Sequence, residues 1–233
     1  MDQAGTPTRM TYALGIECSN PSMRGGSRGE VALAKIVGDG LEYVDSLELA
    51  TDARGSDGLM GAVDALCLKH EIVPADLARI LVSVGPGGYT ALRVSVTVAK
   101  VLATVVGCGV VAVPSAAVAG VGLEGLDAVV ALASKKGLAH CTRIVDGQRK
   151  VLGVIGADEL VGVGAKVLVG DGFVPKDMIE AGEGAGMEFR TIELTARACL
   201  EASVGMDEID PSALGVLYAR EPDAVTQWRA LHG

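Results

Sequence analysis

The sequence contains few aromatic residues and no concentrated positive charge. Aromatic side chains make up 3% of its 233 residues, so a core must be built from Val, Leu, Ile and Ala, as in parallel sheets that are covered by helices. Its 20 basic and 29 acidic residues give a net charge of −9, and its longest basic cluster is the pair Lys135 and Lys136. Because phosphate backbones are bound by concentrated positive charge, the chain alone is a poor candidate for tight nucleic-acid binding.

Metal-binding spacings are also missing. The five cysteines include no C-x-x-C pair, and the histidines at 70, 140 and 232 are 70 and 92 residues apart. No two of these histidines can share one helical turn, so the sequence predicts no metal site of the two-histidine helical type. Cysteines without such spacing are typical of a reduced compartment, and we expect a cytoplasmic location.

Long apolar runs of membrane type are not found either. The longest run, residues 101–119, is interrupted by two glycines, Pro114 and Ser115, so no membrane contact is expected. Residues 1–9 are polar and lack the apolar core of a signal peptide, and we expect a flexible tail there.

Apolar patterning predicts an α/β chain with an internal repeat. Three strands, a helix, a strand, a helix and a strand are predicted over residues 12–17, 29–37, 41–49, 57–71, 79–84, 91–106 and 109–113. Ser56 or Asp57 would cap the first of these helices. This order is that of a ribonuclease-H-like half-domain.

The pattern partly repeats after residue 119. Strands are predicted over residues 128–133, 138–144, 150–155 and 166–169, and a last helix over residues 191–204. We therefore expect two halves, residues 10–118 and residues 119–233. The second would be smaller and more divergent, with a C-terminal extension.

A glycine-rich turn follows the strand at residues 79–84. A strand, a glycine-rich turn and a helix N-terminus can present backbone N–H groups to an anion, so Gly85, Gly87, Gly88 and Thr90 form a candidate phosphate cradle. The turn matches neither the dinucleotide fingerprint nor the P-loop, and Pro86 removes one N–H donor. A tight structural turn is the alternative interpretation.

The residues Glu17, Cys18 and Ser19 end the first predicted strand. They could supply an acid/base group or a nucleophile, but such a nucleophile needs a positioned base and the sequence names none. A structural role is the alternative.

The helix predicted over residues 91–106 is apolar on two faces. One stripe contains Ala91, Val94, Val98, Val101 and Val105, and the other contains Leu92, Val96, Ala99, Ala103 and Val106. A helix that is apolar on two faces must be covered on both. The sheet can cover one face, whereas the second needs either the neighbouring helix or a partner protein.

The segment 82–103 resembles the signature of the TsaB (YeaZ) family. The matching positions are Gly85, Pro86, Gly87, Thr90, Leu92, Arg93, Ala99 and Lys100, whereas Gly88, Tyr89, Ala91 and Ser95 depart from it. The C-terminal Leu217-Tyr218-Ala219-Arg220 resembles another family element, and Ser19 matches at the end of the first strand. The chain therefore resembles a divergent member of the family.

The resemblance implies an actin-like ATPase (ASKHA) fold with two ribonuclease-H-like mixed-sheet halves. It also implies a non-catalytic scaffold or activator subunit of the tRNA N6-threonylcarbamoyladenosine machinery, without peptidase activity. The implied partners are a TsaD-like catalytic subunit and a TsaE-like ATPase. A homodimer would form when the chain is alone, and tRNA would be reached only through the complex.

Two site hypotheses follow from the resemblance. The predicted partner interface comprises Leu59, Met60, Val63, Cys67, Val94, Val98 and Val101. In actin-like ATPases the first strand supplies a carboxylate to nucleotide and Mg²⁺, so Glu17 and Ser19, with Gly85, Gly87, Gly88 and Thr90, could be a vestigial nucleotide site. No cofactor is expected, with ATP or ADP and Mg²⁺ at a partner interface as the exception. The alternative function is a small nucleotide-binding enzyme that uses Glu17 and residues 85–90 around Mg-ATP.

Overall fold

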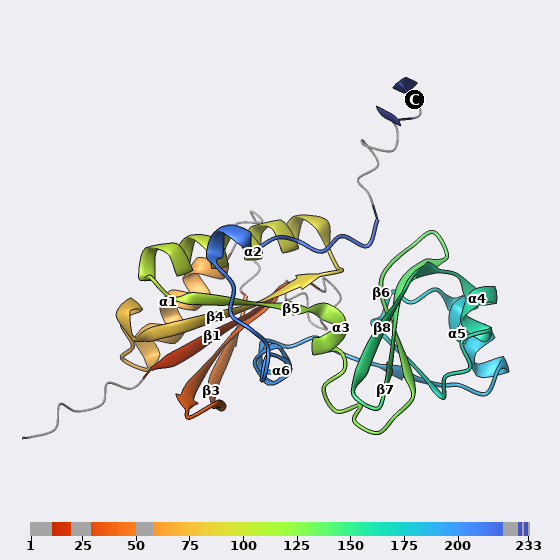
Figure 1. Cartoon of the computed structure of the whole chain (residues 1–233), viewed down its shortest axis with the longest axis horizontal. Coiled ribbons are helices and arrows are strands. Elements are labelled where there is room, and N and C mark those ends of the chain that lie inside the picture. The colour runs from red at the N-terminus through yellow and green to blue at the C-terminus, as the bar shows by residue number, and fades with distance from the viewer. Residues whose placement is uncertain (1–10, 20–28, 50–57, 221–227, 230, 233) are drawn as a thin grey trace, which may run out of the picture.

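The protein folds into two mixed sheets that share one topology. The computed structural model describes residues 11–19, 29–49, 58–220, 228–229 and 231–232. Within these residues the two sheets have five strands each, in the orders β3-β2-β1-β4-β5 and β10-β9-β6-β7-β8. Figure 1 shows the sheets side by side, each with helices on its outer face. The predicted α/β class, with two mixed-sheet halves, is confirmed.

The first sheet is built around its first strand. Its strands are β1 (Tyr12–Glu17), β2 (Glu30–Val37), β3 (Gly40–Glu48), β4 (Leu77–Gly85) and β5 (Gly109–Pro114). β1 pairs antiparallel with β2 and parallel with β4, so it is covered by neighbours on both edges. One face of this sheet is covered by α1 (Leu59–Lys69) and α2 (Tyr89–Val106). The 3₁₀ helix η1 (Pro74–Asp76) leads into β4.

The second sheet repeats this topology. Its strands are β6 (Ala128–Lys135), β7 (Leu138–Val145), β8 (Gln148–Ile155), β9 (Val167–Gly170) and β10 (Glu188–Thr191). β6 pairs antiparallel with β7 and parallel with β9, and thus occupies the place of β1. The outer face is covered by the shorter helices α4 (Ala157–Val161) and α5 (Lys176–Gly184).

A shared core joins the two sheets. It contains buried side chains of β1, β4 and β5 together with those of β6 and β9, such as Leu81 and Val130. The short helices α3 (Ser115–Val118) and α6 (Ala196–Ala202) contribute to the same core. Because this apolar cluster is continuous, the halves are held together by packing of their small aliphatic side chains.

The chain returns to the first half after β10. α6 packs against β1 and β2, and Ile209 forms an antiparallel bridge with Val110 of β5. The 3₁₀ helix η2 (Pro211–Ala213) lies against α2, and the N–H of Leu217 donates to the carbonyl of Val84 at 2.7 Å. The predicted C-terminal extension therefore lies on the first half.

Most predicted elements agree with the structure, and the disagreements are local. β1 has the predicted bounds, and α2 begins two residues earlier than predicted. The last helix spans residues 196–202 instead of 191–204, because Thr191 ends β10 and the Thr195 hydroxyl accepts from the N–H of Ala198 at 3.0 Å. The predicted caps of α1 and the predicted tail lie outside the described residues.

Candidate functional site

The end of β1 places Glu17 in the interior of the protein. Its side chain is 1% exposed, and its Oε1 accepts hydrogen bonds from the N–H and the hydroxyl of Ser19, at 2.6 and 2.5 Å. Among the described residues, Oε2 has no hydrogen-bond partner. Burial raises the pKa of this carboxyl, and the two hydrogen bonds from Ser19 lower it to a smaller extent. A carboxyl buried in this way favours its neutral form.

The glycine-rich turn is packed tightly between two other segments. A Cβ on Gly87 would overlap the carbonyl oxygen of Ser19, and the N–H of Gly88 donates to that same oxygen at 2.8 Å. On the other side, a Cβ on Gly85 would overlap the carbonyl oxygen of Leu217, and Gly85 has a φ of +107°. These two glycines are therefore required by close backbone approach and, at Gly85, by a conformation that favours glycine.

The structure thus brings together most of the predicted vestigial site. Glu17, Ser19, Gly87 and Gly88 are neighbours, whereas Thr90 is exposed in the first turn of α2. The space that a phosphate would need beside the turn is taken by the backbone of Ser19 and Leu217. The geometry favours the structural turn over the phosphate cradle, because a cradle needs open N–H groups.

The two predicted stripes of α2 have different surroundings. Leu92, Val96, Ala99 and Ala103 are at most 6% exposed and pack on the first sheet. Val101 and Val105, on the other stripe, are 55% and 78% exposed, and Val94 and Val98 are half-buried. The sheet covers one face of α2 only, so the second face is open along its C-terminal half.

The face of α1 differs from its prediction. Leu59 and Val63 are 1% and 6% exposed in the core, and Cys67 is partly buried against that core. Residues inside the core cannot form a docking surface, so these two predictions are corrected. Met60 does lie on the surface, and so does Leu68, which the sequence analysis did not select. Apolar periodicity predicted that α1 is a helix, but the residues that it selected lie mainly on the face that packs on the core.

Helix α2 also passes a length and composition test for membrane spans. Its 18 residues have a mean hydropathy of 1.4, and 28% of them are buried. α2 connects β4 with β5 and packs on the first sheet through one face.

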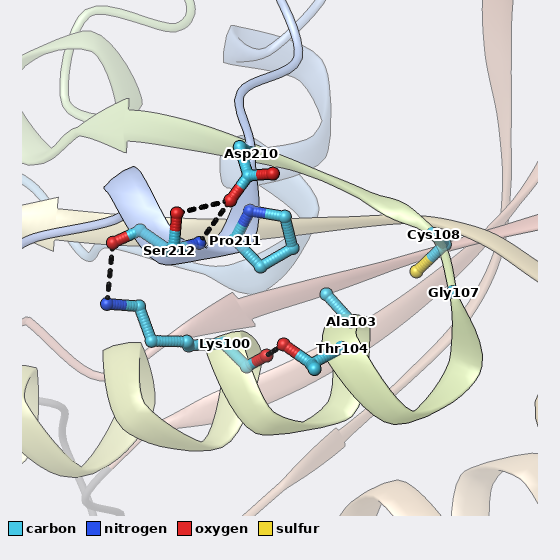
Figure 2. Close-up of a pocket in the computed structure, with 8 residues that line it drawn as sticks. All are labelled: Lys100, Ala103, Thr104, Gly107, Cys108, Asp210, Pro211 and Ser212. Atoms are coloured by element: carbon cyan, nitrogen blue, oxygen red, sulfur yellow. Dashed lines mark hydrogen bonds between the residues drawn. The ribbon is translucent and has the colours of Figure 1, made fainter.

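A shallow pocket lies between the C-terminal half of α2 and η2. Figure 2 shows its lining residues, which enclose a cavity volume of about 530 Å³. The Lys100 ammonium donates to the carbonyl of Ser212 at 3.0 Å, and Asp210 accepts from the N–H of Ser212 at 2.7 Å. Burial raises the pKa of the Cys108 thiol at the far end. These polar groups bond to one another, and the hydrogen bond from Lys100 to Ser212 links α2 to η2.

The two family-like motifs meet at the N-terminus of α2. The ring of Tyr89 stacks on Tyr218 with centroids 5.3 Å apart, and the guanidinium of Arg93 lies over the Tyr89 ring at 5.4 Å. Arg220 donates to the carbonyls of Lys135 and Leu138, both at 3.3 Å. Sequence reasoning noted both motifs separately and missed their contact, since 129 residues separate the two tyrosines.

The histidines lie in separate environments. His70 bonds to Asp45 at 2.8 Å, and His232 stacks on Trp228. His140 is half-buried, and burial lowers its pKa. In the described part of the chain, no three His, Cys, Asp or Glu side chains converge in a way that could hold a metal ion.

Comparison with known proteins finds sequence similarity over part of the chain. Residues 51–134 match the model of the family described as TsaD, tRNA N6-adenosine threonylcarbamoyltransferase. A 62-residue segment is 40% identical to the tRNA threonylcarbamoyladenosine biosynthesis protein TsaB of Bacillus subtilis strain 168. Over these segments the chain is similar to proteins of threonylcarbamoyladenosine biosynthesis. The Bacillus match covers 27% of the chain and 25% of that relative.

Two solved structures of Pseudomonas aeruginosa proteins share the fold of this chain. YeaZ superposes with a TM-score of 0.61 at 15% identity, over 90% of this chain and 100% of that one. An uncharacterised protein with similarity to the peptidase YeaZ gives 0.64 at 15% identity, over 91% and 100%. The structural likeness therefore extends over both sheets, whereas the matched family model runs from α1 through β4, α2, β5 and α3 into β6.

Proposed function

We propose that this chain is a non-catalytic scaffold subunit in the biosynthesis of tRNA threonylcarbamoyladenosine, and that it binds a TsaD-like catalytic subunit. The observation that carries this proposal is the open apolar stripe of α2. A TsaE-like ATPase would join the same complex, and the modified tRNA would be bound mainly by the assembly. The family match supports the pathway, and the stripe supports the mode of action.

The stripe has the composition of an interface centre. Val94, Val98, Val101 and Val105 follow one another at helical spacing, and the 18 residues of α2 include no Asp or Glu. Interface centres are apolar and depleted in charge, and removal of the exposed Val101 and Val105 side chains from water by a partner would be favourable. Met60 on the neighbouring α1 is exposed as well. We assign the docking surface to these five residues.

The non-catalytic assignment rests on the environment of Glu17. Both carboxyl oxygens are buried, and Ser19 already occupies Oε1 with two hydrogen bonds. A carboxylate that binds Mg²⁺ must reach an open position beside the phosphates. We propose that the chain alone holds no Mg-ATP. Titration calorimetry with Mg-ATP and Mg-ADP tests this, and saturable binding that Glu17→Ala abolishes would favour the enzyme alternative.

One substitution pair tests the docking surface. Val101→Arg places a charge on the stripe, and Val151→Arg makes the same change at an equally exposed valine of β8. Since a buried unpaired charge costs several kcal/mol, Val101→Arg should weaken the affinity for the TsaD-like subunit about 100-fold. Val151→Arg should leave it unchanged. Biolayer interferometry measures both, with thermal unfolding as the check on folding. Equal affinity of Val101→Arg and the wild type would refute the assignment.

The same pair tests self-association. We propose that two copies of the chain dimerise through this stripe when the catalytic subunit is absent. The reason is that the exposed valines of the stripe are otherwise left in contact with water. Sedimentation velocity should show a dimer for the wild type and for Val151→Arg, and a monomer for Val101→Arg. A dimer that survives Val101→Arg would place the contact elsewhere.

A further inference from the structure

The junction between α2 and the C-terminal segment carries an exposed stack of planar groups. Arg93 lies over Tyr89, and Tyr89 stacks on Tyr218 at an interplanar angle of 29°. The two tyrosines are 49% and 42% exposed. Two aromatic rings and the planar guanidinium of Arg93 thus form one stack at the surface.

Cationic residues surround this stack. The hydrogen bonds of Arg220 to the carbonyls of Lys135 and Leu138 place the turn between β6 and β7 beside the C-terminal segment. Lys135 and Lys136 in that turn are both exposed. The charge of Arg220 also lowers the pKa of His140, after the larger effect of burial. Asp177 is an acidic side chain that approaches the turn, near Gly137. The local charge is positive in a chain whose net charge is −9.

We propose that this surface, defined by Tyr89, Arg93, Lys135, Lys136, Tyr218 and Arg220 and called the stacked patch, binds an unpaired base of single-stranded RNA with its adjacent phosphates. Aromatic and guanidinium planes stack on any base, and nearby cations neutralise the backbone. A base that stacked on the exposed part of the Tyr218 ring would extend the existing stack by one ring. The proposal rests on the proposed function, because it gives the scaffold a direct contact with the tRNA of the complex.

The patch predicts a weak and sequence-tolerant interaction. It presents planar faces and positive charge, and stacking distinguishes poorly between bases. Four cations would give a salt slope of about −3 for single-stranded RNA. The acidic remainder of the chain opposes RNA, so the contact adds to binding by the assembly and does not replace it.

A binding experiment on the full chain tests the proposal. The probes are a fluorescein-labelled RNA stem-loop and a fully paired RNA duplex of equal length, followed by fluorescence anisotropy at two salt concentrations. The wild type should bind the stem-loop more tightly than the duplex. Tyr218→Ala should lower the stem-loop affinity about tenfold, whereas Tyr218→Phe should retain it, because the ring and not the hydroxyl stacks.

Charge variants keep the test valid if Tyr218→Ala fails to fold. Lys136→Glu should weaken stem-loop binding about fivefold and reduce the salt slope. Lys150→Glu, on exposed β8, is the matched control and should change nothing. Equal binding by Lys136→Glu and Lys150→Glu, equal binding of loop and duplex, or no binding by the wild type would overturn the proposal.

The two proposals can fail separately. Val101→Arg should retain stem-loop binding while it loses the TsaD-like subunit. Lys136→Glu should retain that subunit while it loses RNA affinity. If both variants lost both activities, a general defect of folding would explain them, and thermal unfolding would reveal it.

Discussion

The two halves have the same strand topology but different outer helices. In the first half, α1 and α2 have 11 and 18 residues, whereas α4 and α5 in the second have 5 and 9. α5 directs charged residues outward, including Lys176 and Glu180, which form an ion pair at 3.0 Å. α2 directs valines outward at the corresponding place. The second half folds with a short helix whose outer face is charged. The apolar outer stripe of α2 is therefore not needed for this fold and has another explanation.

The strand ends that approach the junction of the halves also differ. β4 ends in the turn whose glycines are packed between Ser19 and Leu217. β9 ends at Gly170, and the next residue, Asp171, closes its own turn by accepting from the N–H of Phe173 at 2.9 Å. The first strand end depends on distant segments, whereas the second is locally stabilised. Substitutions at equivalent positions of the two strand ends should therefore lower the free energy of unfolding by unequal amounts.

The largest effect is expected at the glycines of these strand ends. Gly87→Ala would force a methyl group against the carbonyl oxygen of Ser19, whereas Gly172→Ala meets open space. Gly87→Ala should lower the free energy of unfolding by about 3 kcal/mol, and Gly172→Ala by less than about 0.5 kcal/mol. Urea unfolding followed by circular dichroism measures both. Similar losses would show that the two strand ends are equally constrained.

An intermediate effect is expected at the buried carboxyls. Burial raises the pKa of Glu17 and, against the hydrogen bond from Phe173, that of Asp171. A folded-state pKa above the unfolded value means that the folded protein binds more protons, so stability falls as pH rises above about 4.5. Glu17→Gln removes this loss and should stabilise the protein at neutral pH by about 1 kcal/mol.

The second half provides the comparison for that variant. Asp171→Asn should give a smaller gain, because Asp171 is less deeply buried than Glu17. Urea unfolding at acidic and neutral pH should show a flatter pH profile for Glu17→Gln than for Asp171→Asn. A Glu17→Gln variant that is less stable than the wild type at neutral pH would indicate that the ionised carboxylate is the stable form.

The smallest effect on stability is expected at the surface contacts of Asp45. Asp45 of β3 contacts Lys69 at 2.7 Å and His70 at 2.8 Å, and these hydrogen bonds lower its pKa to about 2. The stability that this pair contributes is present above pH 3.8 and is lost as the pH falls toward 2. Because the contact is largely exposed, Asp45→Asn should cost about 0.5 kcal/mol at neutral pH. Thermal unfolding at pH 7 and at acidic pH measures the difference, which should vanish in acid.

The sequence predicted the sheets better than the helices of the second half. Strands such as Tyr12–Glu17 are continuous apolar runs, which only a buried strand of that length explains. α5 was missed because Gly182 and Gly184 interrupt its apolar spacing, and β10 was missed because four residues carry too little pattern. Short elements are fixed by tertiary contacts that a local pattern does not contain.

The candidate site was predictable in location but not in orientation. Periodicity identified both stripes of α2, yet it could not determine which stripe the sheet covers, and on α1 it selected Leu59 and Val63, which are buried. The glycine turn was recognised from its composition. Its packing against Leu217 could not be, because that contact joins positions 85 and 217. Contacts between such distant segments are set by the fold.

The return of the C-terminal segment has a consequence for synthesis on the ribosome. α6 and residues 209–217 complete the first half, but they leave the ribosome after the whole second sheet has emerged. Until then the first sheet lacks part of its cover, and the glycine turn lacks the backbone of Leu217 beside it. The first half can therefore reach its final form only late in translation, at about the time that Tyr218 reaches Tyr89.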